Sequence, residues 1–574
     1  MNLKFFAALL SLGFTACAQI PAKIDVAGGV GKPEAPLEAK QPVLPEQDLT
    51  QGMLFDFLLG ETALQRGSPE IAVSTYLGLA KSTRDPRVAQ RATEIALHSR
   101  QPAAALEAVT IWVELDPESI LARQTVTALL VNAGKLSQAQ PHLEKLLASE
   151  GANIGIAFTQ LNNLLARNVN KTETLALVQR LAQLYPNLAE AHFAVGQAAW
   201  LANQFEVALA EMKQAVALRP DWELAAIYQG QILQRGSPAS AIEFFEGYLK
   251  AHPAAKDVRL NYARMLVADK KISQARSQFQ QLLTEYPANA DVALAVGLLS
   301  MELRDFDVAE TSFKKVLELG HKDPGTARFY LARVYEETKR IDMAMEGYRS
   351  VEEGDQYLPA QAKYASLLAK QGKMSEARRH LQQLPAANNQ QRAQLILAEA
   401  QLLRDAGAYQ EVFNLLSSSL EKLPNYPDLL YDRALVAERL GKVDVMEQDL
   451  RKLIQLKPDY AHAYNALGYS FADRGRRLPE ALVLIEKAVK LAPDDPHIID
   501  SLGWVHYRMG NLKEGIKYLN QAFAVRPDPE IAAHLGEVLW KQGEKEEAKK
   551  IWQTALKGDP DNEILLKTIK KFMP

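Results

Sequence analysis

A histidine and a glutamate one helical turn apart come nearest to a metal site in this chain. In the stretch His534-Leu-Gly-Glu537, an imidazole and a carboxylate would project from the same side of a helix. A metal site in a protein usually needs at least three such ligands, and no third ligand follows these two. The 10 histidines are scattered singly along the chain. We therefore predict no metal and no other cofactor.

A second group of chemical interest is the carboxylate pair in Asp494-Asp495-Pro496-His497. Two neighbouring carboxylates are suited to acid–base catalysis. An Asp before a Pro is also typical of a helix start, where the carboxylate accepts hydrogen bonds from free backbone N–H groups. We assign the pair to helix capping. The chain also lacks a glycine-rich phosphate loop, and we expect neither enzymatic activity nor a small-molecule substrate.

The one cysteine, Cys17, ends a short apolar stretch at the N-terminus. Lys4 precedes an apolar run from Phe5 to Phe14, and small residues follow it. This order is typical of a secretory signal, and the run is shorter than the roughly 20 residues of a membrane-spanning helix. The sequence Phe14-Thr15-Ala16-Cys17 resembles the bacterial lipobox. The resemblance implies that residues 1–16 are a signal peptide and that Cys17 carries lipid.

Residues 17–48 contain five prolines and three glycines without a helical or alternating apolar period. We interpret them as a flexible tether. Ala18, rather than Asp, follows the cysteine, and the sorting rule of the enterobacterial lipoproteins then implies the outer membrane. Several acyl chains on Cys17 would anchor the protein stably, since each buried methylene contributes about 0.8 kcal/mol. We expect a lipid-anchored protein that faces the periplasm.

Beyond Leu49, a helical apolar pattern is interrupted at regular intervals. A chain of 574 residues is too long for one hydrophobic core, whereas a repeat array only has to bury each unit against its neighbours. Prolines recur at intervals of 33 to 35 residues, the length of a helix–turn–helix repeat. They are Pro186, Pro220, Pro253 and Pro287, and then Pro424, Pro458, Pro493, Pro527 and Pro560.

Small residues mark the places where two helices of one repeat must come close, at Gly468, Gly503 and Gly536. With the proline period, they resemble the tetratricopeptide-repeat family. The resemblance implies an all-α superhelical solenoid, and we count about fifteen helix pairs. We place divergent repeats at 49–186, the main array at 187–560 and a capping helix at 561–574. Trp552 takes the position of a large core residue.

In this family, partner proteins lie in a groove that the first helix of each repeat lines. Aromatic and cationic residues on those helices have the composition of interface anchors. The alternative for the tryptophans is packing between repeats. Phe193 and Trp200 are expected to face the same groove, and Arg474-Gly475-Arg476-Arg477 is a basic turn that is either a second contact or a solvated loop. The predicted groove residues are Asn465, Tyr469, Trp504, Tyr507, Arg508, Trp540 and Lys541.

The net charge of −3 and the pI of about 6.4 do not indicate a nucleic-acid partner. The C-terminal repeats and the lipobox together resemble the large tetratricopeptide lipoproteins of proteobacterial outer membranes. This resemblance implies a scaffold, in the leading hypothesis an adaptor that brings a periplasmic carboxyl-terminal processing protease to cell-wall hydrolases. The alternatives are an assembly factor for exopolysaccharide export or a pilus secretin, and a module that binds peptidoglycan or another carbohydrate.

Overall fold

The computed structural model describes residues 44–165 and 168–573. Within these ranges the chain forms helices joined by short turns and contains no strand. The predicted signal peptide, the lipidation site Cys17 and the tether up to residue 43 lie outside the described residues. The first described helix begins at Gln51, after Thr50, whose hydroxyl accepts a hydrogen bond from the backbone N–H of Met53. None of the described helices has the length and apolar character needed to cross a membrane.

The chain divides into two compact units, one up to Lys315 and one from Val316, and the boundary falls within α17. The first unit contains a short 3-10 turn (Gly151–Asn153) besides its α-helices. Its α-helices are α2 (Gln51–Gln65), α3 (Pro69–Thr83), α4 (Pro86–His98), α5 (Pro102–Leu115), α6 (Ile120–Asn132), α7 (Leu136–Ser149), α8 (Ile154–Leu165), α9 (Lys171–Ala182), α10 (Ala189–Leu201), α11 (Phe205–Leu218), α12 (Glu223–Gly236), α13 (Pro238–Ala251), α14 (Lys256–Ala268), α15 (Ile272–Glu285), α16 (Ala290–Glu302) and α17 (Phe306–Glu318).

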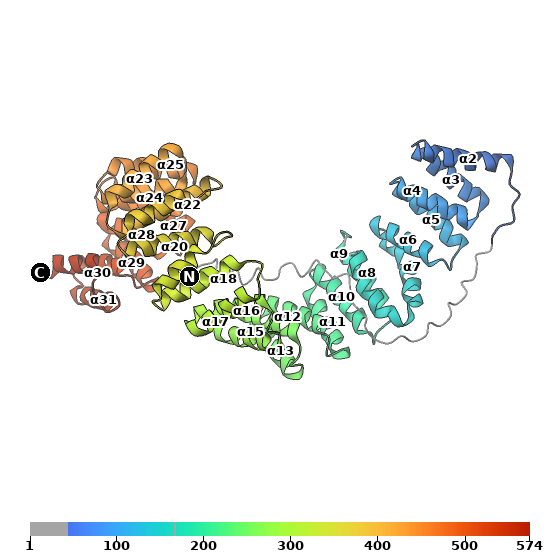
Figure 1. The fold of residues 1–574 in the computed structure, drawn as a ribbon, viewed down its shortest axis with the longest axis horizontal. Helices are drawn as coiled ribbons and strands as arrows, with labels where there is room; N and C mark the ends of the chain where they lie inside the picture. The colour runs from blue at the N-terminus through green and yellow to red at the C-terminus, as the bar shows by residue number, and fades with distance from the viewer. Residues whose placement is uncertain (1–43, 166–167, 574) are drawn as a thin grey trace. The chain divides into compact units, whose positions relative to one another are not determined.

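The second unit continues the same alternation of helices and tight turns (Figure 1). Its helices are α18 (Pro324–Glu337), α19 (Ile341–Arg349), α20 (Tyr357–Lys370), α21 (Met374–Gln383), α22 (Asn389–Asp405), α23 (Tyr409–Lys422), α24 (Pro427–Arg439), α25 (Val443–Leu456), α26 (Ala461–Asp473), α27 (Leu478–Leu491), α28 (Pro496–Arg508), α29 (Leu512–Val525), α30 (Pro529–Gln542), α31 (Lys545–Gly558) and α32 (Glu563–Phe572).

Consecutive helices pack as pairs, for example α2 with α3, α26 with α27 and α30 with α31. Helices α2 to α31 number thirty, as about fifteen pairs require, although α8 and α9 pack mainly on α10 rather than on each other. The predicted all-α repeat architecture is confirmed. Helix α32 follows the last pair and packs on α30 and α31. It occupies the part of the chain where we predicted a final helix.

The two helices of a pair meet at the predicted glycines. A Cβ atom at Gly503 would lie 2.9 Å from the backbone oxygen of Gly515, and one at Gly536 would lie 2.0 Å from Nε1 of Trp552. Both distances are too short for a side chain, so these positions allow the close approach of the two helices. Trp552 itself is 1% exposed, and its predicted place in the core is confirmed.

Asp495, the second carboxylate of the pair, caps the start of α28. The side chain of Asp495 accepts hydrogen bonds from the backbone N–H of His497 at 2.9 Å and of Ile498 at 3.3 Å. Pro496 is the first residue of the helix, where its missing N–H leaves no backbone bond unmade. The capping interpretation of this motif is thereby confirmed.

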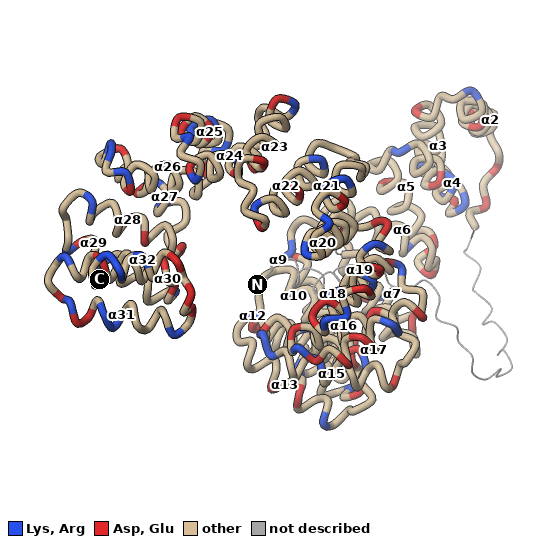
Figure 2. The backbone as a smooth tube through the Cα atoms, turned by 60° about the vertical axis from the view of Figure 1, so that its left-hand side comes forward, with Lys and Arg blue, Asp and Glu red and all other residues tan. Residues whose placement is uncertain are grey.

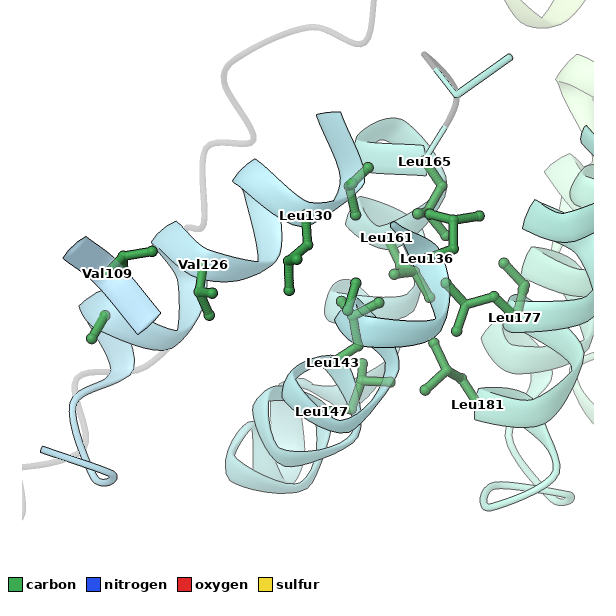
Figure 3. Packing of buried hydrophobic residues seen from close by; sticks show 14 of the residues in the cluster. Val109, Val126, Leu130, Leu136, Leu143, Leu147, Leu161, Leu165, Leu177 and Leu181 are labelled. Carbon is green, nitrogen blue, oxygen red and sulfur yellow. The ribbon is translucent and has the colours of Figure 1, made fainter. Parts of the chain in front are cut away.

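The predicted divergent repeats share one continuous apolar core with the first helices of the predicted main array. Side chains from α5 to α9 contribute to one cluster of buried residues, and Figure 3 shows leucines and valines of successive helices pointing toward one another. Each pair therefore buries apolar surface against its neighbours, as a repeat array requires. The labelled residues are Val109, Val126, Leu130, Leu136, Leu143, Leu147, Leu161, Leu165, Leu177 and Leu181.

Acidic and basic residues are interspersed along the helices of each unit (Figure 2). At the basic turn between α26 and α27, Arg477 donates a hydrogen bond to Glu447 at 2.8 Å and lies 3.7 Å from Glu480. Its guanidinium also lies over the ring of Phe471, 4.0 Å from the ring centroid. Arg477 is thus engaged within the second unit, which favours a structural role for this part of the turn.

Candidate functional site

Aromatic and charged side chains gather on the first helices of the last three pairs, α26, α28 and α30. Because equivalent positions of successive repeats lie side by side in a stacked array, residues about one repeat apart in sequence come together here. We call this group the Trp504 cluster. Its members are Tyr469, Asp500, Trp504, Tyr507, His534 and Glu537.

Trp504 lies at the centre of the cluster. Its ring stacks on the imidazole of His534, with 4.2 Å between the ring centroids, and lies tilted against Tyr507 at 5.1 Å. The residue is 6% exposed, and its Nε1 is buried without a hydrogen-bond partner. Trp504 therefore offers little surface to a partner and instead fixes the positions of His534 and Tyr507.

His534 and Asp500 form a largely buried charged pair. Nδ1 of His534 lies 2.9 Å from Oδ2 of Asp500, and because a carboxylate only accepts, the imidazole donates this bond. Burial disfavours the charged imidazole, but the charge and the hydrogen bond of Asp500, with smaller contributions from other carboxylates, together outweigh burial, and the pKa of His534 is raised above its ordinary value. Asp473 and Glu530 act in the same direction from α26 and α30. The imidazolium form is thus favoured within the cluster.

Tyr469 reaches His534 across an intervening helix pair. Its hydroxyl lies 3.3 Å from Nε2 of His534, although Tyr469 belongs to α26 and His534 to α30. First helices that are two pairs apart can touch over α28 only if this side of the array curves inward. The first helices in this part of the second unit therefore line an inner, concave side, as the family resemblance implies.

Tyr507 continues the network toward the C-terminus. Its hydroxyl donates to Oε1 of Glu537 at 3.1 Å, and the ammonium of Lys571 on α32 lies 3.1 Å from the same oxygen. Burial, and then the charge of Glu537, raise the pKa of Tyr507 to about 12. The phenol therefore stays protonated at neutral pH and remains a hydrogen-bond donor.

Arg508 lies at the edge of the cluster. Its guanidinium donates to the backbone oxygen of Asp473, lies 3.8 Å from the carboxylate of that residue, and lies 5.9 Å from the ring centroid of Trp504. Its side chain keeps 29% of its surface exposed. Asn465, another predicted groove residue, lies on α26; it is half-buried, and its Oδ1 makes no hydrogen bond. Arg508 and Tyr507 thus place a cation and an aromatic ring next to each other, beside the buried Trp504.

The structure separates the remaining predicted groove residues from the Trp504 cluster. Trp540 stacks on Trp552 at 5.7 Å and lies against Phe572 on α32 at 6.1 Å. Lys541 is exposed, with its ammonium 5.7 Å from the ring centroid of Phe572. Trp540 therefore packs between the last helix pair and α32, which is the alternative to groove binding that we considered for the tryptophans. Whether any of the predicted residues binds a partner stays a prediction.

The prediction that Phe193 faces the groove is wrong. Phe193 is 1% exposed and packs against Trp222 at 4.6 Å and Tyr228 at 5.3 Å, so it belongs to the core between α10 and α12. Trp200 is half-buried and lies edge-on to Phe205 of the following helix. A large ring on a first helix therefore does not by itself indicate a groove residue.

The two ends of the metal-like motif have separate partners. His534 bonds Asp500 and Tyr469, whereas Glu537 bonds Tyr507 and Lys571. Among the residues that the structure describes, no three His, Cys, Asp or Glu side chains gather closely enough to hold a metal ion. Sequence reasoning missed the contributions of Asp500, Glu537 and Lys571 to this region. Their spacing of 34 residues, from Asp500 to His534 and from Glu537 to Lys571, is the signal that could have revealed them.

Stacked helix pairs with a glycine contact define an all-α repeat protein. Sequence models of the tetratricopeptide repeat match residues 233–299 in one case, and residues 294–359, 414–496 and 501–563 in another. The TPR repeat-containing protein PA4667 of Pseudomonas aeruginosa is 33% identical to this chain over 480 residues, which cover 83% of this chain and 81% of that protein. The chain belongs to the tetratricopeptide-repeat proteins, whose repeats form scaffolds for protein–protein interaction.

Other relatives match parts of the chain. The human mitochondrial import receptor subunit TOM70 is 25% identical over 36% of this chain and 35% of its own length. The cellulose synthase operon protein C of Pseudomonas fluorescens is 26% identical over 45% of this chain and 21% of its own length. Among solved structures, TTC0263, a thermophilic TPR protein of Thermus thermophilus, shares 23% identity over 32% of this chain and 99% of its own, with a TM-score of 0.30.

The raised pKa of His534 leads to a prediction about stability and pH. A histidine whose pKa is higher in the folded state stabilises the fold below its unfolded pKa of about 6.5, and this contribution is lost as the pH rises through the folded value. We expect the urea midpoint of the second unit to fall as the pH rises above about 6.5. The fall should be absent in His534→Gln and in Asp500→Asn. Equal pH dependence in all three proteins would contradict the assignment.

Proposed function

We propose that the chain is a non-enzymatic scaffold that captures a partner protein on the concave side of its C-terminal repeats. The observation that carries the proposal is the pairing of Tyr507 and Arg508 on that side, next to the buried Trp504. An aromatic ring and a guanidinium held by fixed neighbours can make contacts with little loss of conformational freedom. Charge-assisted donors such as Arg508 favour carboxylates or backbone oxygens of the partner.

We further propose that a lipid on Cys17 anchors the scaffold to the membrane and that its repeats lie in the periplasm. The lipobox-like sequence and the Pro-rich residues 17–48 support this placement. In this setting, the leading hypothesis is an adaptor that holds a carboxyl-terminal processing protease and its cell-wall hydrolase substrates together. A scaffold that binds both proteins raises the effective concentration of one near the other, and needs no catalytic group of its own.

A second candidate is an assembly factor for polysaccharide export. The observation that favours it is the partial likeness to the cellulose synthase operon protein C. The two candidates differ in what the native protein recovers from cross-linked membranes. Recovery of the processing protease supports the adaptor, whereas recovery of polysaccharide synthase or export components supports assembly. Recovery of no protein at all would count against both.

Replacing Cys17 with Ser tests the membrane anchor. The serine hydroxyl is not a substrate for the thioether linkage of a lipobox cysteine, so we expect the variant to move from the membrane fraction to the soluble periplasmic fraction. The comparison is made by fractionation of cells that express either form at the same level. If the serine variant stays with the membranes as the native protein does, the lipid anchor is wrong.

A further inference from the structure

The helix pair α12–α13 in the first unit contains two buried polar groups without partners. Gln229 on α12 is 6% exposed, and its Oε1 makes no hydrogen bond. Tyr248 on α13 is 7% exposed, and its hydroxyl also lacks a partner. A buried polar atom without a hydrogen bond destabilises a fold, so such an atom in a native protein calls for an explanation.

The other pairs with the same glycine contact place apolar residues at both positions. A Cβ atom at Gly230 would meet Phe245, just as one at the corresponding glycine of six other pairs meets the large residue of its own second helix. The residue before that glycine is Gln229 here, and in those six pairs it is the exposed Leu59 or the buried Val195, Val296, Leu467, Leu502 or Leu535.

The position of Tyr248 shows the same contrast. It lies three residues after Phe245, and the equivalent residues of the other pairs are small or apolar and buried. The fold of this repeat therefore does not require either the amide or the phenol. In the six pairs with the glycine contact, the equivalents of Tyr248 are Leu79, Ala215, Val316, Ala488, Ala522 and Ala555.

Gln229 and Tyr248 line one hollow, whose walls come from α11, α12 and α13. Its volume is about 470 Å³, and its walls include the half-buried Leu233 and Phe244. Lys213 and Glu243 line it with exposed, oppositely charged side chains. Burial, with smaller contributions from Glu223 and Asp221, raises the pKa of Tyr248 to about 12, so its hydroxyl keeps its proton. The hollow thus offers a neutral acceptor, a neutral donor and apolar walls.

We propose that this hollow is a second binding site, which takes a peptide segment of a partner protein through the side-chain amide of an Asn or Gln. Such a carboxamide presents an N–H donor and a C=O acceptor side by side, which complement Oε1 of Gln229 and the hydroxyl of Tyr248. The apolar walls of Leu233 and Phe244 suit an aliphatic side chain next to that amide. A fully charged group finds no buried counter-charge there, which disfavours it. The site lies in the other unit from the Trp504 cluster and does not depend on the function proposed for that cluster.

The test uses the full chain and two variants that restore the residue type of the other repeats. A phage library of random twelve-residue peptides is first depleted on Gln229→Leu and then selected on the native protein. We expect peptides to survive this depletion and to bind Tyr248→Phe about tenfold more weakly than the native protein, since one hydrogen bond to a buried group is worth roughly that factor. We also expect the melting temperatures of both variants to equal or exceed that of the native protein, because each variant removes an unpaired polar atom.

Gln234→Leu is the matched control, because Gln234 lies on the same helix but does not line the hollow. This variant should bind the selected peptides as the native protein does. The proposal is overturned if no peptide survives depletion or if Tyr248→Phe binds the survivors unchanged. It is also overturned if the hollow takes a carbohydrate instead, that is, if Gln229→Leu lowers binding of the sugar chitotriose and not of peptides. None of these outcomes bears on Tyr507 and Arg508, so failure here is distinguishable from failure of the proposed function.

Discussion

Replacing Trp552 with Ala is expected to destabilise the C-terminal end of the array by about 3–5 kcal/mol, the usual cost of removing a fully buried tryptophan. Its indole is 1% exposed and fills the space above Gly536. It also stacks on Trp540 and on Phe572 of α32. The variant leaves a cavity between Gly536 of α30, Trp540 and Phe572 of α32.

In a linear array each repeat contacts only its neighbours, so the loss should stay local. We expect amide hydrogen exchange to become faster in α30 to α32 and to remain unchanged in the unit up to Lys315. Trp540→Ala is the matched control: it removes an indole of equal size from a half-buried site and should cost clearly less. Equal losses in the two variants, or faster exchange throughout the chain, would be inconsistent with this packing.

The second large effect is expected at the proposed protein-binding surface. Replacing Tyr507 and Arg508 together with Ala should weaken binding of the partner about hundredfold, because two anchors of about 1–2 kcal/mol each are removed from one patch. Trp504 is kept, since it is 6% exposed and supports the cluster from below. Helical content should not change, because Tyr507 contributes only its backbone N and its Cβ to the glycine contact between α28 and α29, and alanine keeps both atoms. Isothermal titration of the purified partner against native protein and variant measures the ratio of the two dissociation constants.

The second helix of the same repeat supplies a matched control. On α29, Lys517 lies 5.0 Å from the ring centroid of Tyr518, so this pair also joins a cation to an aromatic ring. Lys517 is exposed and Tyr518 is half-buried, and both belong to the second helix rather than to the concave side. Ala at both positions should leave binding within about twofold of the native value.

The repeat architecture could be predicted from the sequence because it depends on local and periodic signals. A proline every 33 to 35 residues, with a glycine at one fixed place, determines where helices begin and where they touch. The number of pairs, the core position of Trp552 and the capping role of Asp495 all follow from such signals. Each concerns one helix or one pair, which a single repeat of sequence can encode.

The candidate site was only partly predictable, since it depends on how neighbouring repeats curve. The pattern placed Trp504, Tyr507 and Tyr469 on first helices, and the structure brings them together. It did not reveal that Trp504 is buried under His534, or that Asp500 holds His534 from the previous repeat. The same limit applies to Phe193, which has the residue type of an anchor but lies in the core. Side-chain exposure at equivalent positions is decided by the residues one and two repeats away.

The proposed function requires that the concave side of α28 binds the partner protein. It is tested by the dissociation constant of the partner for three full-length proteins: native, Tyr507→Ala with Arg508→Ala, and Lys517→Ala with Tyr518→Ala. We expect affinity to fall about hundredfold in the first variant and by no more than about twofold in the second. Equal affinities of all three proteins, or a larger loss in the variant of α29, would contradict it.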